Sequence, residues 1–376
     1  MSQSDTITFH FINFQLYKLN CMDIKQELNE ILNNLIQNKG SDLHISVGRR
    51  PTLRVDGSLI PIASKDIVDE NYAGQFIKEM LTEDQQKRFY EERELDFSYT
   101  FSDLARFRVN VFWQRGQFAA AMRLIPATIR TLDELEHPQM LHGVTKVSQG
   151  FFLVVGPSGQ GKSTTLAAMV DEINHQRACH IITIEDPIEY LFTNDKAIID
   201  QREIGHDTKS FNSALRSVLR QDPDVIMVGE MRDPETISAA ITAAETGHLV
   251  FSTLHTNNAS QTIDRIIDSF PPAQQNQIRA QLSGTLIGVL SKRLIPKING
   301  GRVPAFELMN ANAAVKNLIR ENKTHQIDLV IETSAEDGMI SLNRSLAQLV
   351  KKGEISYDDA VMHSLNPSEL RMLVAR

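Results

Sequence analysis

The feature that most constrains this sequence is a glycine-rich loop between a predicted strand and a predicted helix. Residues 156–163 read Gly-Pro-Ser-Gly-Gln-Gly-Lys-Ser, directly after the apolar run 151–155 and before a helical stretch over 164–173. A P-loop requires this order, because its backbone N–H groups surround phosphate oxygens and the helix N-terminus adds positive potential. The sequence therefore predicts a nucleotide-phosphate site after a strand.

The predicted nucleotide-binding residues run through the loop into the first helical turn. Lys162 is expected to reach the β- and γ-phosphates and Ser163 to bind Mg²⁺, so that ATP and Mg²⁺ are the expected cofactors. At Gln160 the backbone is expected to do the binding, and its side chain is expected to matter little. The full set is Gly156, Pro157, Ser158, Gly159, Gln160, Gly161, Lys162, Ser163 and Thr164.

Two further predicted strands end in carboxylates. The strand over 181–184 is followed by Glu185, Asp186 and, beyond a proline, Glu189, and the strand over 225–228 is followed by Gly229 and Glu230. Ligands bind at the carboxyl ends of strands in doubly wound sheets, and P-loop enzymes need acids there to hold the metal shell and orient water. Any one acid alone is equally explained as a helix cap or a solvated charge, but the group favours catalysis.

Two histidines flank the predicted strand over 249–252. His255 lies at the same end as the acids, and His248 lies at the other end. This placement argues against a shared metal site. A structural role is the alternative for His255, but its neighbours favour a sensor of the γ-phosphate.

The chain is predicted to be α/β with two domains. Residues 1–22 form an extension that is expected to be disordered, and residues 23–127 combine an amphipathic helix with short strands, which indicates an α+β domain. Residues 128–148 are the expected linker. From 149 to 376, strands alternate with helices, as in a parallel sheet covered by helices, with a helical region from about residue 304.

Composition limits the other classes of function. Of the 376 residues, 41% are hydrophobic and 23% charged, which is typical of a globular protein, and the net charge of −8 disfavours a nucleic-acid groove. The two cysteines have no metal-binding spacing. No apolar run approaches the roughly 18 residues of a membrane span, so only peripheral membrane association is expected.

The order of the motifs resembles the secretion ATPase superfamily. Residues 156–163, 184–189, 228–233 and 253–256 correspond to its Walker A, Asp box, Walker B and His box. Over nearly all of residues 23–376 the chain is similar to the type IV pilus retraction ATPase family. The similarity includes Ser41-Asp42-Leu43-His44-Ile45, Arg106-Phe107-Arg108-Val109-Asn110 and Asn317-Leu318-Ile319-Arg320-Glu321.

The resemblance implies a PAS-like N-terminal α+β domain followed by a RecA-like P-loop ATPase domain with C-terminal helices. It also implies roles for single residues. Glu189 would be the catalytic glutamate, acting with Lys162, and His255 would sense phosphate. Glu230 would be the Walker B acid, which holds Mg²⁺ through water together with Ser163. Glu185 and Asp186 would complete the acidic box, and Arg108, Arg123 and Arg106 would reach a nucleotide bound to a neighbouring subunit.

The implied function is a hexameric ATPase that powers pilus retraction in twitching motility. Its implied partners are an inner-membrane pilus platform protein and a second pilus ATPase, its place is the cytoplasmic face of the inner membrane, and no nucleic acid is expected. Three alternatives remain open. They are a nucleic-acid translocase, a nucleotide-gated assembly factor without hydrolysis, and an accessory motor that works with a partner ATPase.

Overall fold

The computed structural model describes residues 24–55, 57–102, 105–125 and 128–375. It consists of two compact units, an N-terminal unit up to residue 127 and a C-terminal unit from residue 128. The predicted disordered extension over residues 1–22 lies outside the described residues.

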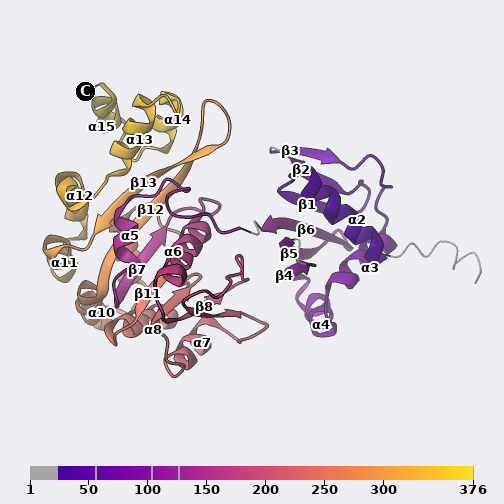
Figure 1. Ribbon diagram of the computed structural model, residues 1–376, viewed down its shortest axis with the longest axis horizontal. Coiled ribbons are helices and arrows are strands. Elements are labelled where there is room, and N and C mark those ends of the chain that lie inside the picture. Colours follow the sequence, from indigo (N-terminus) through magenta and orange to yellow (C-terminus); the bar gives the residue numbers. More distant parts are fainter. Residues whose placement is uncertain (1–23, 56, 103–104, 126–127, 376) are drawn as a thin grey trace, which may run out of the picture. The chain divides into compact units, whose positions relative to one another are not determined.

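The N-terminal unit is a six-stranded antiparallel sheet with helices packed against one face (Figure 1). The strand order is β3-β2-β1-β6-β5-β4. The strands are β1 (Asp42–Ser46), β2 (Thr52–Val55), β3 (Ser58–Pro61), β4 (Glu94–Phe101), β5 (Ala105–Gln114) and β6 (Gln117–Ile125), and the helices are α2 (Ile24–Gln37), α3 (Glu70–Met80) and α4 (Glu83–Glu92).

Simple sequence patterns explain this unit. The predicted amphipathic helix is α2, which buries Leu28, Ile31, Leu32 and Leu35 on one face, as its 3.6-residue period requires. Strand β5 alternates, because successive side chains of a strand point to opposite faces. Its apolar residues Phe107, Val109 and Val111 are buried in the core, and the residues between them face away from the helices.

The C-terminal unit is built on a seven-stranded sheet in the order β13-β12-β7-β11-β10-β8-β9. Its strands are parallel except for the edge strand β13, so the predicted α/β class is confirmed and the sheet is mixed. The strands are β7 (Gly150–Val155), β8 (His180–Glu185), β9 (Ile198–Glu203), β10 (Val225–Val228), β11 (Leu249–Leu254), β12 (Leu286–Pro296) and β13 (Arg302–Asn310).

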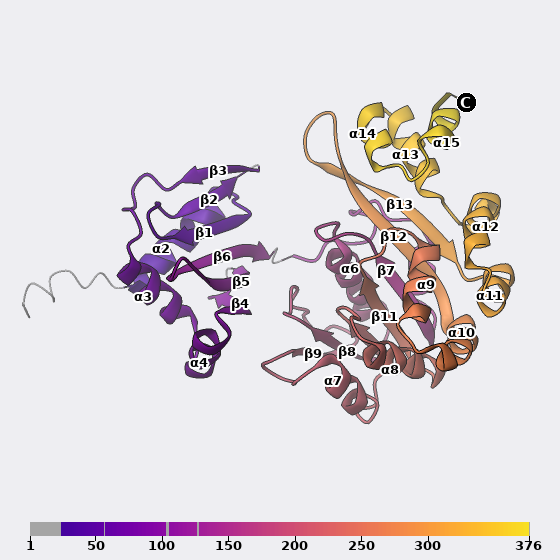
Figure 2. The same cartoon turned by 180° about the vertical axis from the view of Figure 1, so that it is seen from behind.

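Helices cover both faces of this sheet (Figures 1 and 2). One face packs on α5 (Met140–Val144) and α6 (Lys162–Gln176). The opposite face packs on α7 to α12, and α13 to α15 form a separate cluster with the far ends of β12 and β13. These helices are α7 (Phe211–Val218), α8 (Pro234–Glu245), α9 (Ala259–Asp268), α10 (Pro272–Thr285), α11 (Ala313–Arg320), α12 (Ile327–Thr333), α13 (Leu342–Lys351), α14 (Tyr357–His363) and α15 (Pro367–Ala375).

One boundary differs from the sequence expectation. Helices were expected from about residue 304, but residues 302–310 form β13, and the helices that follow begin with α11 at Ala313. The strand forms because β13 pairs antiparallel with β12 along its whole length, from Gly288↔Asn310 to Pro296↔Arg302. Tertiary pairing decides the conformation of a short apolar run here.

No helix among the described residues is long and apolar enough to cross a bilayer.

The packing of α2 generates a stability prediction. Leu32 is 0% exposed, whereas Leu59 in the same unit is 54% exposed. Leu32→Ala should lower the free energy of unfolding of the N-terminal unit by about 2–5 kcal/mol, because it leaves a cavity. Urea unfolding followed by circular dichroism measures this change. The matched variant Leu59→Ala should change the free energy by about 0.5 kcal/mol or less, and equal effects would contradict the core assignment.

Candidate active site

The phosphate loop follows β7 and takes a shape that depends on glycine. Gly156 has φ of 143°, and Gly159 and Gly161 each have φ of 76°, a region that L side chains rarely adopt. A Cβ atom at Gly156 would lie 2.5 Å from the Lys292 carbonyl oxygen of β12. The loop therefore passes so close to β12 that only glycine fits at its first position.

Lys162 begins α6 and folds back over the loop. Its Nζ donates to the carbonyl oxygens of Gly156 at 2.8 Å and Pro157 at 3.1 Å. Burial lowers the pKa of Lys162, and the nearby charges of Glu230 and Glu189 oppose that effect. The two glutamates predicted from separate strand ends thus act on the same ammonium group.

His255 lies between the loop and Glu230. Its Nδ1 is 3.3 Å from Lys162 Nζ and 3.5 Å from Ser158 Oγ, and its Nε2 is 3.5 Å from Glu230 Oε2. Arg232 Nη2 contacts the other oxygen of Glu230 at 2.5 Å. The predicted residues brought together here are Ser158 and Lys162 of the loop, Glu230 after β10 and His255 after β11.

Side-chain hydrogen bonds hold the ends of β10 and β11 in register. Ser252 Oγ donates to the Val228 carbonyl at 2.8 Å, and Thr253 Oγ1 donates to the Gly229 carbonyl at 2.7 Å. These bonds place the residues that follow each strand, Glu230 and His255, at the same edge of the sheet.

Glu185 is buried at the end of β8, and burial raises its pKa to about 7. It accepts hydrogen bonds from Thr183 Oγ1 at 2.7 Å, from Gln201 Nε2 at 3.3 Å and from the backbone N–H of Glu189 at 3.4 Å. Asp186 is exposed, whereas Glu189 is half-buried. Glu185 therefore positions the backbone that carries Glu189.

The helix after the loop also contacts the acidic segment. Ser163 is exposed, and the next residue, Thr164, shares a hydrogen bond of 2.9 Å between its Oγ1 and the Tyr190 hydroxyl. Gln160 Oε1 accepts from the backbone N–H of Leu294 at 2.6 Å. The Gln160 side chain thus has a structural partner that the sequence does not indicate.

His248 lies outside this constellation. His248 Nδ1 is 2.8 Å from the Ala243 carbonyl, which is a structural contact at the opposite edge of the sheet. Within the described residues, no group of three or more His, Cys, Asp or Glu side chains is arranged to hold a metal ion.

The predicted arginines lie on the sheet face of the N-terminal unit that faces away from its helices. Arg108 and Arg123 are direct cross-strand neighbours on β5 and β6, and Arg123 in turn pairs with Asp42 of β1. Arg123 Nε donates to Asp42 Oδ1 at 2.9 Å although its side chain is 69% exposed. Arg106 Nη2 donates to Ser98 Oγ at 2.7 Å. The face thus carries a row of arginines.

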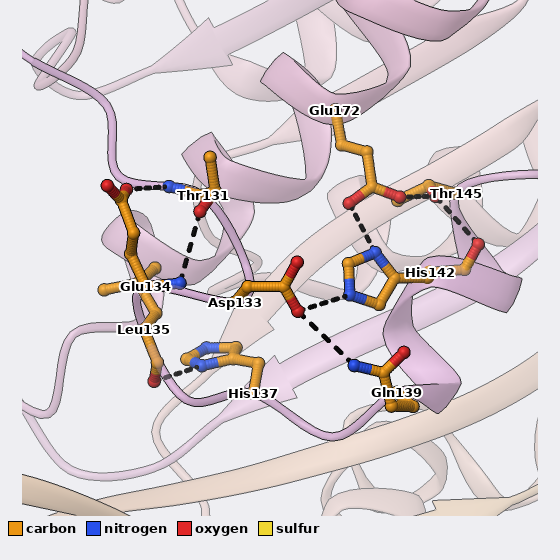
Figure 3. A network of polar contacts seen from close by, with 9 residues as sticks. All are labelled: Thr131, Asp133, Glu134, Leu135, His137, Gln139, His142, Thr145 and Glu172. Atoms are coloured by element: carbon orange, nitrogen blue, oxygen red, sulfur yellow. Dashed lines mark hydrogen bonds and ion pairs between the residues drawn. The ribbon is translucent and has the colours of Figure 1, made fainter.

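The segment over 128–148, which the sequence indicates as a linker, is docked on α6. Figure 3 shows His142 between two carboxylates, with Nδ1 2.7 Å from Glu172 and Nε2 3.3 Å from Asp133. Thr145 Oγ1 donates to the second oxygen of Glu172 at 2.7 Å. Nearer the loop, His137 Nε2 is 2.7 Å from Thr165 Oγ1. The connection between the units is attached to the phosphate-loop helix.

Sequence reasoning did not identify several supporting residues. Thr183, Gln201 and Tyr190 hold the acidic segment, and Lys292 lies beneath the loop on β12. Thr183, Gln201 and Lys292 are polar residues within strands, and Tyr190 lies in the segment between β8 and β9; in the sequence, such residues are equally typical of solvated positions. Only the pairing of the strands distinguishes a supporting residue from a solvated one.

Glu185 generates a prediction about pH. Its pKa of about 7 lies above the ordinary value of 4.5, so its contribution to stability is largest below pH 4.5 and is lost as the pH rises through 7. Gln cannot ionise, so Glu185→Gln should gain stability over wild type between pH 5 and 8, by about 3 kcal/mol at most. Chemical unfolding at several pH values measures the difference. A gain that is equal at both ends of this range would contradict the prediction, and the exposed Glu336→Gln is the matched control.

Comparison with known proteins identifies the family of the chain. The family described as Type II/IV secretion system protein matches residues 20–361. The chain is 46% identical over 334 residues to the "Type IV pilus retractation ATPase PilT" of Pseudomonas aeruginosa, covering 89% of this chain and 97% of that protein. It is 45% identical over 321 residues to a "Twitching motility protein" of Neisseria gonorrhoeae, covering 85% and 86%.

A solved structure shows the same fold. The crystal structure of the pilus retraction motor PilT with bound ADP has a TM-score of 0.85 and 46% sequence identity, and the match covers 92% of this chain and 98% of that one. The resemblance stated from the motifs is thereby confirmed. The chain belongs to the type II/IV secretion system protein family and, within it, to the PilT family of type IV pilus retraction ATPases.

Proposed function

We propose that this chain hydrolyses ATP and uses the energy, as a hexamer, to retract type IV pili in twitching motility. The observation that carries the proposal is that the phosphate-loop lysine, the strand-end glutamates and His255 meet at one sheet edge. The relatives named for pilus retraction and twitching motility are 46% and 45% identical to this chain over 334 and 321 aligned residues.

The loop fits the phosphate groups of a nucleotide. Glycines at positive φ let the loop backbone curl and pass close to β12, where a Cβ atom at Gly156 would not fit. Lys162 Nζ donates to two loop carbonyls, which carry no net charge to balance that of the ammonium group. When ATP binds, Lys162 exchanges these carbonyls for the β- and γ-phosphate oxygens, and the backbone N–H groups from Ser158 to Thr164 bind the remaining oxygens.

Ser163 and Glu230 would hold Mg²⁺, Glu230 through a water molecule. Bound Mg²⁺ neutralises charge on the phosphate oxygens and aligns them for in-line attack. Ser163 is exposed in the first turn of α6, and the mostly buried Glu230 contacts Arg232 and His255 with its two oxygens.

Hydrolysis transfers the γ-phosphoryl group of ATP to water, as the bond to the bridging oxygen breaks and ADP leaves. Glu189 orients the water and accepts its proton as the new bond to phosphorus forms, while Lys162 stabilises the developing charge. His255, in contact with Lys162 and Glu230, would sense whether the γ-phosphate is present. Glu185 and Asp186 form the rest of the acidic box.

The arginines of the N-terminal unit would act in a homo-hexamer. Arg108, Arg123 and Arg106 would reach the nucleotide of a neighbouring subunit, and closure around ATP would convert hydrolysis into movement. The antiparallel sheet with helices on one face supports a PAS-like N-terminal domain. The position of β7 between β11 and β12 supports a RecA-like core, with boundaries near 23–127 and 149–376 around the docked segment.

The proposed setting is the cytoplasmic face of the inner membrane. The motor would associate there peripherally, with an inner-membrane pilus platform protein and a second pilus ATPase as partners. The net charge of −8 supports a function without nucleic acid.

Steady-state ATP hydrolysis by the purified chain, with the oligomer mass recorded in parallel, tests the proposal. Glu189→Ala should still bind nucleotide but lower kcat by about 10²–10⁴-fold, because the water loses its general base. Lys162→Ala should lose nucleotide affinity as well. The exposed Glu336→Ala removes the same charge far from the loop and should hydrolyse ATP like wild type.

Other outcomes would favour the alternatives. Wild type that binds ATP without turnover would indicate a nucleotide-gated assembly factor, and turnover that requires single-stranded DNA would indicate a translocase. If the chain turns over only with a second pilus ATPase present, it is an accessory motor. Loss of pilus retraction in cells that carry Glu189→Ala, with pili still assembled, would support retraction as the use of the energy.

A further inference from the structure

Lys292 is a buried cation outside the mechanism above. It lies in the middle of β12 and is 3% exposed. Its Nζ donates to Thr165 Oγ1 at 3.1 Å and to the Gly161 carbonyl at 3.4 Å, both in the first turn of the phosphate-loop helix. Over the described part of the chain, Lys292 forms no ion pair with a carboxylate. An unpaired ammonium group is costly to bury, so its position requires a reason.

The hydrogen bonds around Lys292 have a defined direction. His137 Nδ1 is 2.9 Å from the Leu135 carbonyl, which only accepts, so Nδ1 carries the proton. His137 Nε2 therefore accepts from the Thr165 hydroxyl at 2.7 Å, a shorter contact than the 3.1 Å from that hydroxyl to the Gly161 carbonyl. Thr165 Oγ1 in turn accepts from Lys292. Burial, together with the charge of Lys292, lowers the pKa of His137 to about 3, which keeps the ring neutral.

Strand β12 also contacts the loop through its backbone. The Lys292 carbonyl oxygen would lie only 2.5 Å from a Cβ atom at Gly156, so the loop and the strand are in close backbone contact there. The Leu294 N–H donates to the Gln160 side chain at 2.6 Å. With the bond from Lys292 Nζ to Gly161, residues 292–294 hold the beginning, middle and end of the phosphate loop.

The charges around Lys292 are mostly positive. Arg130 from the docked segment and Arg302 from β13 add to the burial that lowers the pKa of Lys292 to about 7. Lys162 of α6 lies on the Gly156 and Pro157 carbonyls, and Glu307 of β13 accepts from the Ala259 N–H at the start of α9. A negative ligand in the loop would therefore supply the charge that this surrounding lacks.

We propose that Lys292 is a positioning residue for the phosphate loop: it fixes the first turn of α6 through Thr165 and the Gly161 carbonyl and places a positive charge beneath the bound phosphates. The inference rests on the proposed nucleotide binding. It has a consequence in solution, because phosphate groups in the loop favour the protonated form of Lys292. Nucleotide binding should then take up a proton near neutral pH, and affinity should fall as the pH rises through 7.

Calorimetric titration with ADP, in two buffers of different ionisation enthalpy and from pH 6.5 to 8.5, tests the proposal. Lys292→Met keeps the volume but removes the charge and the donor, so the Kd for ADP should rise about tenfold or more. The free energy of unfolding of the nucleotide-free protein should stay equal or increase, because a neutral side chain replaces a buried charge. A purely structural role predicts that affinity and stability fall together.

Two further variants complete the test. Lys292→Gln retains a donor to Thr165, so it should bind ADP more tightly than Lys292→Met yet lack the additional proton uptake of wild type. The exposed Lys351→Met is the control for removal of one positive charge and should bind like wild type. The ionisation of ADP itself is common to all variants and cancels in the difference.

The outcomes separate the two proposals. If wild type does not bind ADP, the proposed function fails, and the role of Lys292 fails with it. If wild type binds ADP but Lys292→Met binds equally well, or loses stability in proportion to affinity, only the role of Lys292 is overturned. A tenfold loss of affinity with unchanged stability and a flatter pH profile would support it.

Discussion

The parallel pairing of β7 between β11 and β12 is the constraint on which the site depends. The register pairs Val155 with Leu254 and Val228 with Ser252, so the residues that follow these strands emerge side by side. Because β8 is separated from β7 by β11 and β10, the chain after the phosphate loop must pass both strands, and it does so through α6, which packs on one face of the sheet. A one-residue slip would turn each of these side chains to the opposite face of the sheet. The site is therefore a consequence of sheet order as much as of the loop itself.

Glu185 and Glu189, the carboxylates at and after the end of β8, differ in their burial. Glu185 is enclosed, accepts three hydrogen bonds and has a pKa of about 7, so it loses its proton only near neutral pH. Glu189 is half-buried and close enough to Lys162 to affect its pKa. This difference in environment indicates a structural role for Glu185 and a chemical role for Glu189. The bond from the Glu189 N–H to Glu185 links the roles, because it fixes the backbone of the residue proposed to orient water.

The sequence predicted the parts of the structure that follow from local pattern. The glycine loop, the buried strands β7, β8, β10 and β11 and the helix α2 are continuous or periodic apolar patterns, and the structure has them. The sequence patterns do not predict β12, because its apolar run is interrupted by Ser291, Lys292 and Arg293, and they predict helix where the structure has β13. Both strands are determined by pairing with distant residues. The supporting role of Lys292 was unpredictable for the same reason, because a lysine in an unrecognised strand is indistinguishable from a solvated charge.

The helix α6 is where the remaining parts of the C-terminal unit meet. On one side, His137 holds Thr165 and the pair His142 and Thr145 holds Glu172, so the connection from the N-terminal unit cannot shift without breaking these bonds or moving α6. On the other side, β12 contacts the loop through Lys292 and Leu294.

The same strand reaches the C-terminal helices. Arg293 donates to the His363 carbonyl at 3.2 Å, and Ile295 packs in the cluster of α13 to α15. The connecting segment is therefore hydrogen-bonded to α6, whereas the C-terminal helices are attached to β12, the strand that contacts the phosphate loop. Both parts thus reach the loop through hydrogen bonds that end on β12, the loop itself or α6, and neither connection passes through the packed interior of the sheet.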